Sequence, residues 1–201
     1  MVGQEVDEAY LQALRELILE DELLKKEGSK LKVVFSSLHG TGVRTVPAML
    51  KASGVDASPV AAQEKGDGRF PTVKSPNPEN GEALVLGIEQ AKREKADLVL
   101  ATDPDADRMG VALRNAAGEY ELITGNQIGS LMAAYRIERM RAKGWIRAGE
   151  EKNCCLIKTF VTTDLQKEMA AAAGMKCVET LTGFKYIGEK LGIYEKQGSV
   201  S

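Results

Sequence analysis

Three aspartates occupy alternate positions in one short stretch of the chain, TDPDADR at residues 102–108. Alternate residues of an extended backbone share a face, so the carboxylates of Asp103, Asp105 and Asp107 can converge if the stretch stays near-extended. Three like charges in a partly desolvated place repel one another unless a cation neutralises them. Hard oxygen ligands favour Mg²⁺, Mn²⁺ or Ca²⁺, and the pattern therefore predicts a divalent-metal site.

The residues around the aspartates test this interpretation. Arg108 adds a permanent cation that suits phosphate recognition. An acidic turn that merely faces water is the alternative, and the apolar run LVLAT at 98–102 directly before the turn argues against it. An EF-hand loop is excluded, because its sixth and twelfth positions hold Arg108 and Arg114 instead of Gly and Glu.

The elements that would position these residues alternate between short apolar strands and amphipathic helices. A buried strand over 96–102 delivers the aspartates at its carboxyl end, where open α/β sheets bind ligands. A strand over 31–37 enters the loop LHGTG, and 108–115 with 119–124 form an antiparallel hairpin that turns at Gly118. The expected fold is α/β with a mixed sheet. Helices are predicted over residues 5–27, 42–53, 82–95, 124–143 and 163–173.

Residues 144–152 are typical of a linker, so we expect a first domain over 1–150 and a second unit over 151–201. The second unit restarts the strand and helix alternation but offers only two strands. Fewer than about 60 residues seldom bury enough surface to fold alone, and the second α/β unit is therefore expected to be incomplete.

Composition narrows the function classes. Of 201 residues, 27 are Lys or Arg and 29 are Asp or Glu, and this balance argues against a nucleic-acid partner. The apolar stretches are shorter than the ~20 residues of a membrane span, and the start of the chain lacks signal-peptide order, so a cytoplasmic location is expected. The three cysteines have neither metal-ligand nor disulfide spacing.

The stretch TDPDADR resembles the metal-binding loop of the α-D-phosphohexomutases, the superfamily of phosphoglucomutases and phosphomannomutases. Three further stretches agree with that family in order. SSLHGTG at 36–42 resembles the loop that opens its second domain, FPTVKSPNPEN at 70–80 its Pro-Asn segment, and ETLTGFKYIGEK at 179–190 its third-domain sugar loop. The last is similar to the branch of phosphoglucomutases and phosphopentomutases. The resemblance implies a three-layer α/β/α second domain followed by the first part of the third.

The resemblance also implies residue roles. Asp103, Asp105 and Asp107 would hold Mg²⁺, and Arg108 would steady the phosphoryl group. Lys158 aligns with a lysine that approaches the reacting sugar and could assist proton transfer. A strand-end lysine that only reaches toward water is the alternative for Lys158.

By the same resemblance, Thr182, Gly183 and Phe184 would lie against the sugar. The structural alternatives are a helix cap for Gly183 and an ordinary core anchor for Phe184. His39 invites assignment as a general base, but a loop histidine bonded to the backbone is the favoured interpretation.

The phosphorylated serine of that family lies in a Ser-His-Asn-Pro type loop of the first domain, which no stretch of this chain matches. The chain is therefore expected to be a fragment of a Mg²⁺-dependent phosphosugar mutase, an intramolecular phosphotransferase, and to be inactive without domains 1 and 4. Its partners would be a phosphosugar and those domains, with no nucleic acid or membrane, and a homodimer could form through the incomplete unit. Two alternatives remain open, a haloacid-dehalogenase-like phosphatase and a non-catalytic metal-binding module derived from a mutase.

Overall fold

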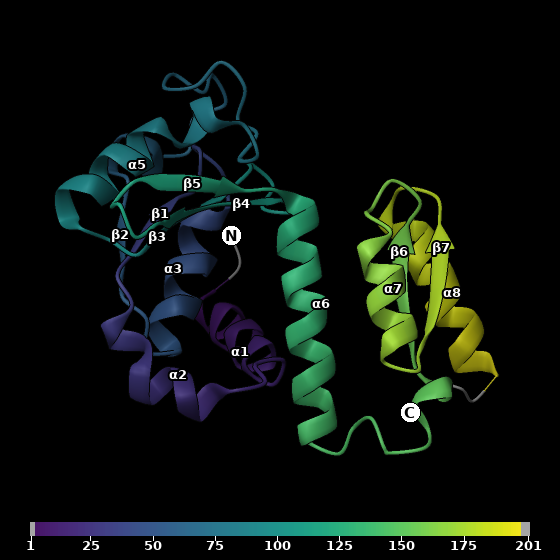
Figure 1. Cartoon of the computed structure of the whole chain (residues 1–201). Coiled ribbons are helices and arrows are strands. Elements are labelled where there is room, and N and C mark those ends of the chain that lie inside the picture. The colour runs from purple at the N-terminus through teal and green to yellow at the C-terminus, as the bar shows by residue number, and fades with distance from the viewer. Residues whose placement is uncertain (1–2, 198–201) are drawn as a thin grey trace. The chain divides into compact units, whose positions relative to one another are not determined.

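A computed structural model of the chain describes residues 3–197. The chain divides into two compact units, residues 1–125 and residues 126–201, which are taken in turn below (Figure 1). No helix among residues 3–197 combines the length and the apolar character needed to cross a membrane.

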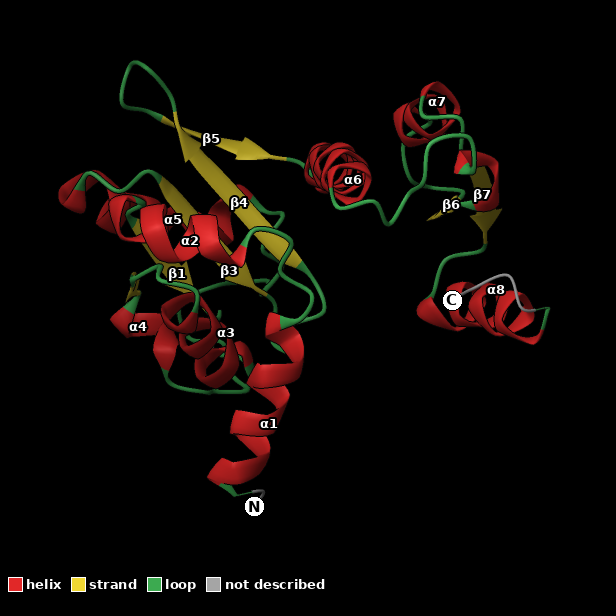
Figure 2. Ribbon diagram, turned by 90° about the horizontal axis from the view of Figure 1, so that it is seen from below, coloured by secondary structure: helices red, strands yellow, loops and turns green. Residues whose placement is uncertain are grey.

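The first unit is built on a five-stranded sheet in the order β2-β1-β3-β4-β5. The strands are β1 (Val33–Ser36), β2 (Ala57–Pro59), β3 (Leu98–Thr102), β4 (Met109–Arg114) and β5 (Tyr120–Ile123). The pairs of β1 with β2 and β3 are parallel, whereas β4 runs antiparallel to both β3 and β5. Figure 2 shows β4 and β5 as one hairpin. Gly118, with a left-handed φ of 84°, lies in its turn, where its N–H donates to the Asn115 carbonyl at 2.9 Å. The predicted mixed α/β sheet is confirmed.

Helices cover both faces of this sheet. α5 (Gly81–Glu94) packs on β1 and β3, while α3 (Gly42–Ala52) lies across the sheet from it and carries α1 (Gln4–Arg15) against its outer side (Figure 1). The remaining short helices of this unit are α2 (Asp21–Glu27), α4 (Ala61–Glu64) and a 3₁₀ turn at Gly28–Lys30. The arrangement has the three layers expected of an α/β/α domain.

The core of the first unit explains why β1 and β3 are central. All four residues of β1 are buried, because helices cover it from both sides. One cluster of small and branched apolar side chains joins the inner face of α5 to the sheet: Val34, Leu38, Val60, Ala83, Leu84, Ala91, Ala96, Val99, Ala101 and Ala112. The strands β1 and β3, whose carboxyl ends carry the loops of interest, are therefore fixed by close packing against α5.

The predicted opening helix over 5–27 is wrong in one respect, because the structure divides it into α1 and α2. The break spans residues 16–20 and turns Leu19 into the interior, where 5% of it is exposed. Arg15 and Asp21 form an ion pair across the break, at 3.3 Å. The free energy gained by burying Leu19 thus exceeds what a continuous helix over residues 16–20 would contribute.

The second unit comprises α6 (Gly125–Ala142), a 3₁₀ turn (Glu151–Asn153), β6 (Cys155–Thr159), α7 (Leu165–Ala172), β7 (Lys176–Thr180) and α8 (Phe184–Lys196). β6 and β7 form a parallel two-stranded sheet, and α7 packs on both strands. The division between the units falls one helix earlier than the boundary expected near residue 150. The reason is that α6 bonds to this unit: Asn126 Oδ1 accepts from the Thr163 N–H at 3.0 Å, and Arg141 donates to the Ala173 carbonyl at 2.5 Å.

Candidate functional site

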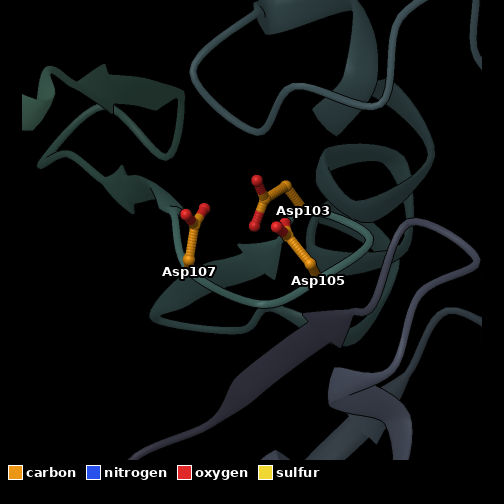
Figure 3. A group of neighbouring side chains, drawn as sticks. All are labelled: Asp103, Asp105 and Asp107. Carbon is orange, nitrogen blue, oxygen red and sulfur yellow. The ribbon is translucent and has the colours of Figure 1, made fainter. Parts of the chain in front are cut away.

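The three aspartates lie in the connection between β3 and β4, at the carboxyl end of β3. Thr102 and Met109 are paired across the base of this connection, so residues 103–108 form the tip of a hairpin. The structure brings the carboxylates together: one oxygen from each of Asp103, Asp105 and Asp107 lies within 4.8 Å of the others (Figure 3). We refer to residues 103–108 as the aspartate tip.

The three carboxylates differ in exposure. Asp103 is fully buried, whereas Asp105 and Asp107 are exposed. Partial desolvation by the neighbouring side chains raises the pKa of Asp107, and the negative charges of Asp105 and Asp103 raise it further. A cation bound among the three oxygens would relieve this repulsion, which is what a divalent metal supplies.

Asp103 also organises the aspartate tip. Its Oδ1 accepts from the backbone N–H of Arg108 at 2.9 Å, and its Oδ2 accepts from the Arg108 Nε at 2.7 Å. Burial alone would raise the pKa of Asp103, but these bonds and the guanidinium charge outweigh it and hold that pKa below its ordinary value. The Asp103 carbonyl accepts from Ala106 N at 3.0 Å, and Ala106 takes a left-handed φ of 61°.

The donor set suits a hard divalent cation. Three carboxylates supply only oxygen atoms, and Asp105 and Asp107 are accessible from solvent. Arg108 stands beside them with its side chain 53% exposed, so it can meet a phosphate oxygen while its Nε remains on Asp103. These residues fit the Mg²⁺ site that the family resemblance implies.

Two other loops with motifs of that resemblance lie against the aspartate tip and β4. Thr41 N donates to the Pro104 carbonyl at 2.8 Å, and a Cβ added at Gly110 in β4 would lie 2.0 Å from the Pro78 carbonyl oxygen. His39 Nε2 and the Thr72 hydroxyl join these two loops at 2.9 Å. The stretches 36–42, 70–80 and 102–108 therefore form one assembly.

His39 is a structural residue of this assembly. It is 5% exposed, and its Nδ1 lies 3.0 Å from the Lys65 carbonyl, to which it donates. Nε2 then accepts from the Thr72 hydroxyl. Both ring nitrogens are occupied, which agrees with the expected backbone-bonded loop histidine.

Lys158 is buried in the second unit, with its side chain 1% exposed. Its ammonium contacts Glu179 at 2.6 Å, Asp164 at 3.2 Å and the Thr162 carbonyl at 3.0 Å. The hydrogen bond to Glu179 raises the pKa of Lys158, burial opposes that effect, and Asp164 reinforces it. Lys158 does not reach toward water, and its three donors are all engaged.

Sequence reasoning missed the partners of Lys158. Glu179 lies opposite Lys158 in the parallel register of β6 and β7, so the strand pairing itself predicts an opposite-charge pair. Asp164 comes from the loop before α7, and no periodicity in the sequence points to it.

The predicted sugar-contacting residues lie together where β7 leads into α8. Gly183 precedes the helix with φ 120° and ψ 136°, and Thr182, Gly183 and Phe184 are all exposed. Phe184 is 78% exposed and is therefore not a core anchor within the second unit.

Comparisons with known proteins identify the family of this chain. The model of phosphoglucomutase/phosphomannomutase alpha/beta/alpha domain II matches residues 8–118, and that of domain III matches residues 124–195. The phosphoglucomutase of Staphylococcus aureus N315 is 40% identical over 164 residues, which are 81% of this chain and 28% of the relative. The phosphoglucomutase of strain USA300 is 39% identical over the same length.

Solved structures show the same fold. A phosphomannomutase-family structure from Thermus thermophilus aligns with a TM-score of 0.69 and 26% identity, over 92% of this chain and 38% of its own. A phosphoglucomutase/phosphomannomutase family protein from Burkholderia thailandensis aligns with a TM-score of 0.63 and 22% identity, over 80% and 31%. The chain thus spans between a quarter and two fifths of these relatives. The haloacid-dehalogenase alternative is set aside, and the chain belongs to the phosphoglucomutase/phosphomannomutase family.

Proposed function

We propose that this chain carries the metal loop and part of the sugar platform of a Mg²⁺-dependent phosphosugar mutase. The whole enzyme moves a phosphoryl group between sugar carbons through a phosphoserine and a bisphosphorylated sugar. The observation that carries the proposal is the convergence of Asp103, Asp105 and Asp107 beside Arg108, in a chain of this family.

The division of labour follows from the demands of phosphoryl transfer. This reaction depends on positioning and charge neutralisation, and bound Mg²⁺ supplies a large share of both. The three aspartates hold the ion. Arg108 keeps its Nε on Asp103 and presents its terminal amino groups to a phosphate oxygen.

The second unit provides the sugar platform. Lys158 supplies a fixed positive charge, because Glu179 favours its charged form at neutral pH, and it would assist proton transfer to the sugar only after exchanging one of its three present partners. The exposed Thr182, Gly183 and Phe184 offer a hydroxyl, an open backbone and an apolar face to the sugar.

A mutase assay with glucose 1-phosphate and Mg²⁺ tests this proposal. The chain alone is expected to show no turnover, and a mixture with separately produced domains 1 and 4 of a relative, together with the remainder of its domain 3, is expected to show it. Asp105→Asn in the same mixture should abolish the gain. Turnover by the chain alone would overturn the requirement for an external serine.

The same experiment separates the mutase from the non-catalytic alternative. A chain that binds Mg²⁺ but gives no turnover in any mixture would favour a metal-binding module without catalysis. Equal Mg²⁺ binding by the wild type and Asp105→Asn, measured by isothermal titration, would contradict the metal site itself.

We also infer that the second unit promotes a homodimer. Within residues 3–197, β6 and β7 pair only with each other, which leaves two outer strand edges. Large apolar side chains are exposed around the ends of these strands: Phe160, Val161, Leu165 and Leu181. Such a surface favours self-association.

A further inference from the structure

The loop SSLHGTG lies directly against the aspartate tip, within the first unit. We infer that Thr41 and Gly40 are positioning residues, which hold Pro104 so that Asp103 and Asp105 keep the spacing a metal requires. This inference rests on the proposed metal site and adds two residues to it that do not touch the ion.

Thr41 binds the aspartate tip by two hydrogen bonds to one atom. Its backbone N–H donates to the Pro104 carbonyl at 2.8 Å, and its hydroxyl donates to the same oxygen at 3.1 Å. Pro104 separates the first two aspartates, and its carbonyl belongs to the planar peptide that begins Asp105. Fixing this oxygen therefore fixes the plane from which the second carboxylate extends.

Gly40 allows the two loops to approach this closely. A Cβ added at Gly40 would lie 2.3 Å from the Pro104 Cα and 2.5 Å from the Pro104 carbonyl oxygen. The φ of Gly40 does not lie in the left-handed region, so the missing side chain, not backbone freedom, is what this position requires. Any larger residue would push Pro104 away.

The loop that carries Thr41 is itself held firmly. Leu38 and His39 take left-handed φ values of 45° and 65°, and the Gly40 N–H closes a turn onto the Ser37 carbonyl at 2.8 Å. His39 N donates to the Gln63 carbonyl at 3.0 Å, and Gln63 is fully buried. A non-glycine left-handed backbone persists only where its surroundings enforce it, so this loop provides a stiff support.

Binding of Mn²⁺ to the full chain tests the inference. Paramagnetic broadening of amide signals reports weak as well as tight binding and locates the ion on the aspartate tip. Thr41→Val should weaken Mn²⁺ binding about three- to fivefold, the effect of one partly exposed hydrogen bond. Thr41→Ser keeps the hydroxyl and should stay within about twofold of the wild type.

Two further variants complete the test. Gly40→Ala should weaken Mn²⁺ binding by about tenfold or more, because Pro104 must move. Thr45→Val makes the same substitution as Thr41→Val one turn along α3, and it should leave the affinity unchanged. Circular dichroism on each variant separates loss of fold from loss of affinity.

The outcomes distinguish this inference from the proposed function. Folded Thr41→Val and Thr41→Ser variants with equal, wild-type affinity would overturn the positioning role while leaving the metal site intact. If the wild type itself shows no broadening at residues 103–108, the metal site is wrong and the inference falls with it. If Gly40→Ala does not fold, the Thr41 pair decides the question.

Discussion

At the scale of single residues, the three aspartates are chemically unequal. Asp103 is buried and bonded twice to Arg108, so it serves the loop as well as the proposed ion. Asp105 and Asp107 are exposed, and their carboxylates face Asp103 across the aspartate tip (Figure 3). Substitutions at these positions should therefore have different effects on folding and on metal binding.

Asp105→Asn is expected to weaken Mg²⁺ binding by about tenfold or more, because one anionic ligand is lost. Its effect on the free energy of unfolding without metal should stay within about 0.5 kcal/mol, as for other exposed positions. Isothermal titration and urea unfolding measure the two quantities, with the exposed Asp56→Asn as the control. A loss of stability as large as the loss of affinity would contradict this division of roles.

Asp103→Asn is expected to lower the free energy of unfolding by about 1.5–3 kcal/mol even without metal, since a hydrogen bond to a charged group is replaced by a neutral one. The pKa of Asp103 lies below its ordinary value. The ionised carboxylate therefore contributes fully to the free energy of unfolding above about pH 4, and this contribution disappears as pH falls through the lower folded pKa. The stability gap between wild type and Asp103→Asn should therefore close as the solution is acidified. Urea unfolding between pH 7 and pH 2 measures this gap, and a constant gap would contradict the assignment.

At the scale of elements, β4 meets the loop 70–80 without space for a side chain. A Cβ at Gly110 would lie 2.0 Å from the Pro78 carbonyl oxygen and 2.9 Å from the Pro78 Cβ, and Pro78 is fully buried. Gly110→Ala should lower the free energy of unfolding by about 2 kcal/mol or more. Gly68→Ala adds the same methyl where no atom lies within 4 Å, so it is the matched control. Equal stability of the two variants, measured by urea unfolding, would contradict this close contact.

β6 and β7 are joined by charge as well as by backbone bonds. Lys158 is protonated beside Glu179, and its pKa is raised in the folded state. The ion pair therefore contributes fully to the free energy of unfolding below the ordinary lysine pKa of about 10.4. This contribution is lost as pH rises through the higher folded pKa. Lys158→Met should remove this alkaline sensitivity and leave the second unit less stable at pH 7. Hydrogen exchange of the β6 and β7 amides between pH 7 and pH 8, compared with Glu179→Gln, measures the loss at neutral pH, and thermal unfolding to pH 11 measures the alkaline part. Unchanged protection in both variants would contradict the role of this ion pair.

The local pattern of apolar and turn residues predicted most helices and strands, but it did not predict where one element breaks or which unit it joins. The strand before Asp103 and the turn at Gly118 were predictable, because apolar runs and turn glycines act over a few neighbouring residues. The break after α1 was not, since it depends on burial of Leu19 by the rest of the unit. The sequence also could not assign α6 to the second unit, because its hydrogen bonds join it to residues more than thirty positions away.

At the scale of the whole molecule, the candidate site was predictable in part. The aspartates and Arg108 follow one another in sequence, so their proximity needed only one strand and one turn. The contact from Thr41 to Pro104 depends on tertiary folding, and the contact from Asp164 to Lys158 depends on the path of the loop after β6, so no spacing in the sequence records either one. Family resemblance identified the segments but not the bonds between them.

The exposed edges of the second unit lead to a prediction about assembly. Sedimentation velocity over a hundredfold range of concentration should show a monomer–dimer equilibrium, and Phe160→Ser together with Leu181→Ser should shift it toward monomer. Lys190→Ser, elsewhere in the same unit, is the control. A monomer at every concentration would count against the homodimer.

The aspartate tip also has a consequence for transplantation. It spans six residues and is closed at its base by one strand pair, Thr102 with Met109, so it has the size of an insert that another antiparallel ribbon could accept. A grafted aspartate tip would keep its internal hydrogen bonds between Asp103 and Arg108. It would lose the two hydrogen bonds from Thr41 to Pro104, because Thr41 belongs to another loop. A graft that fails to bind metal until a second loop is supplied would show how much of a metalloprotein's affinity belongs to residues that never meet the ion.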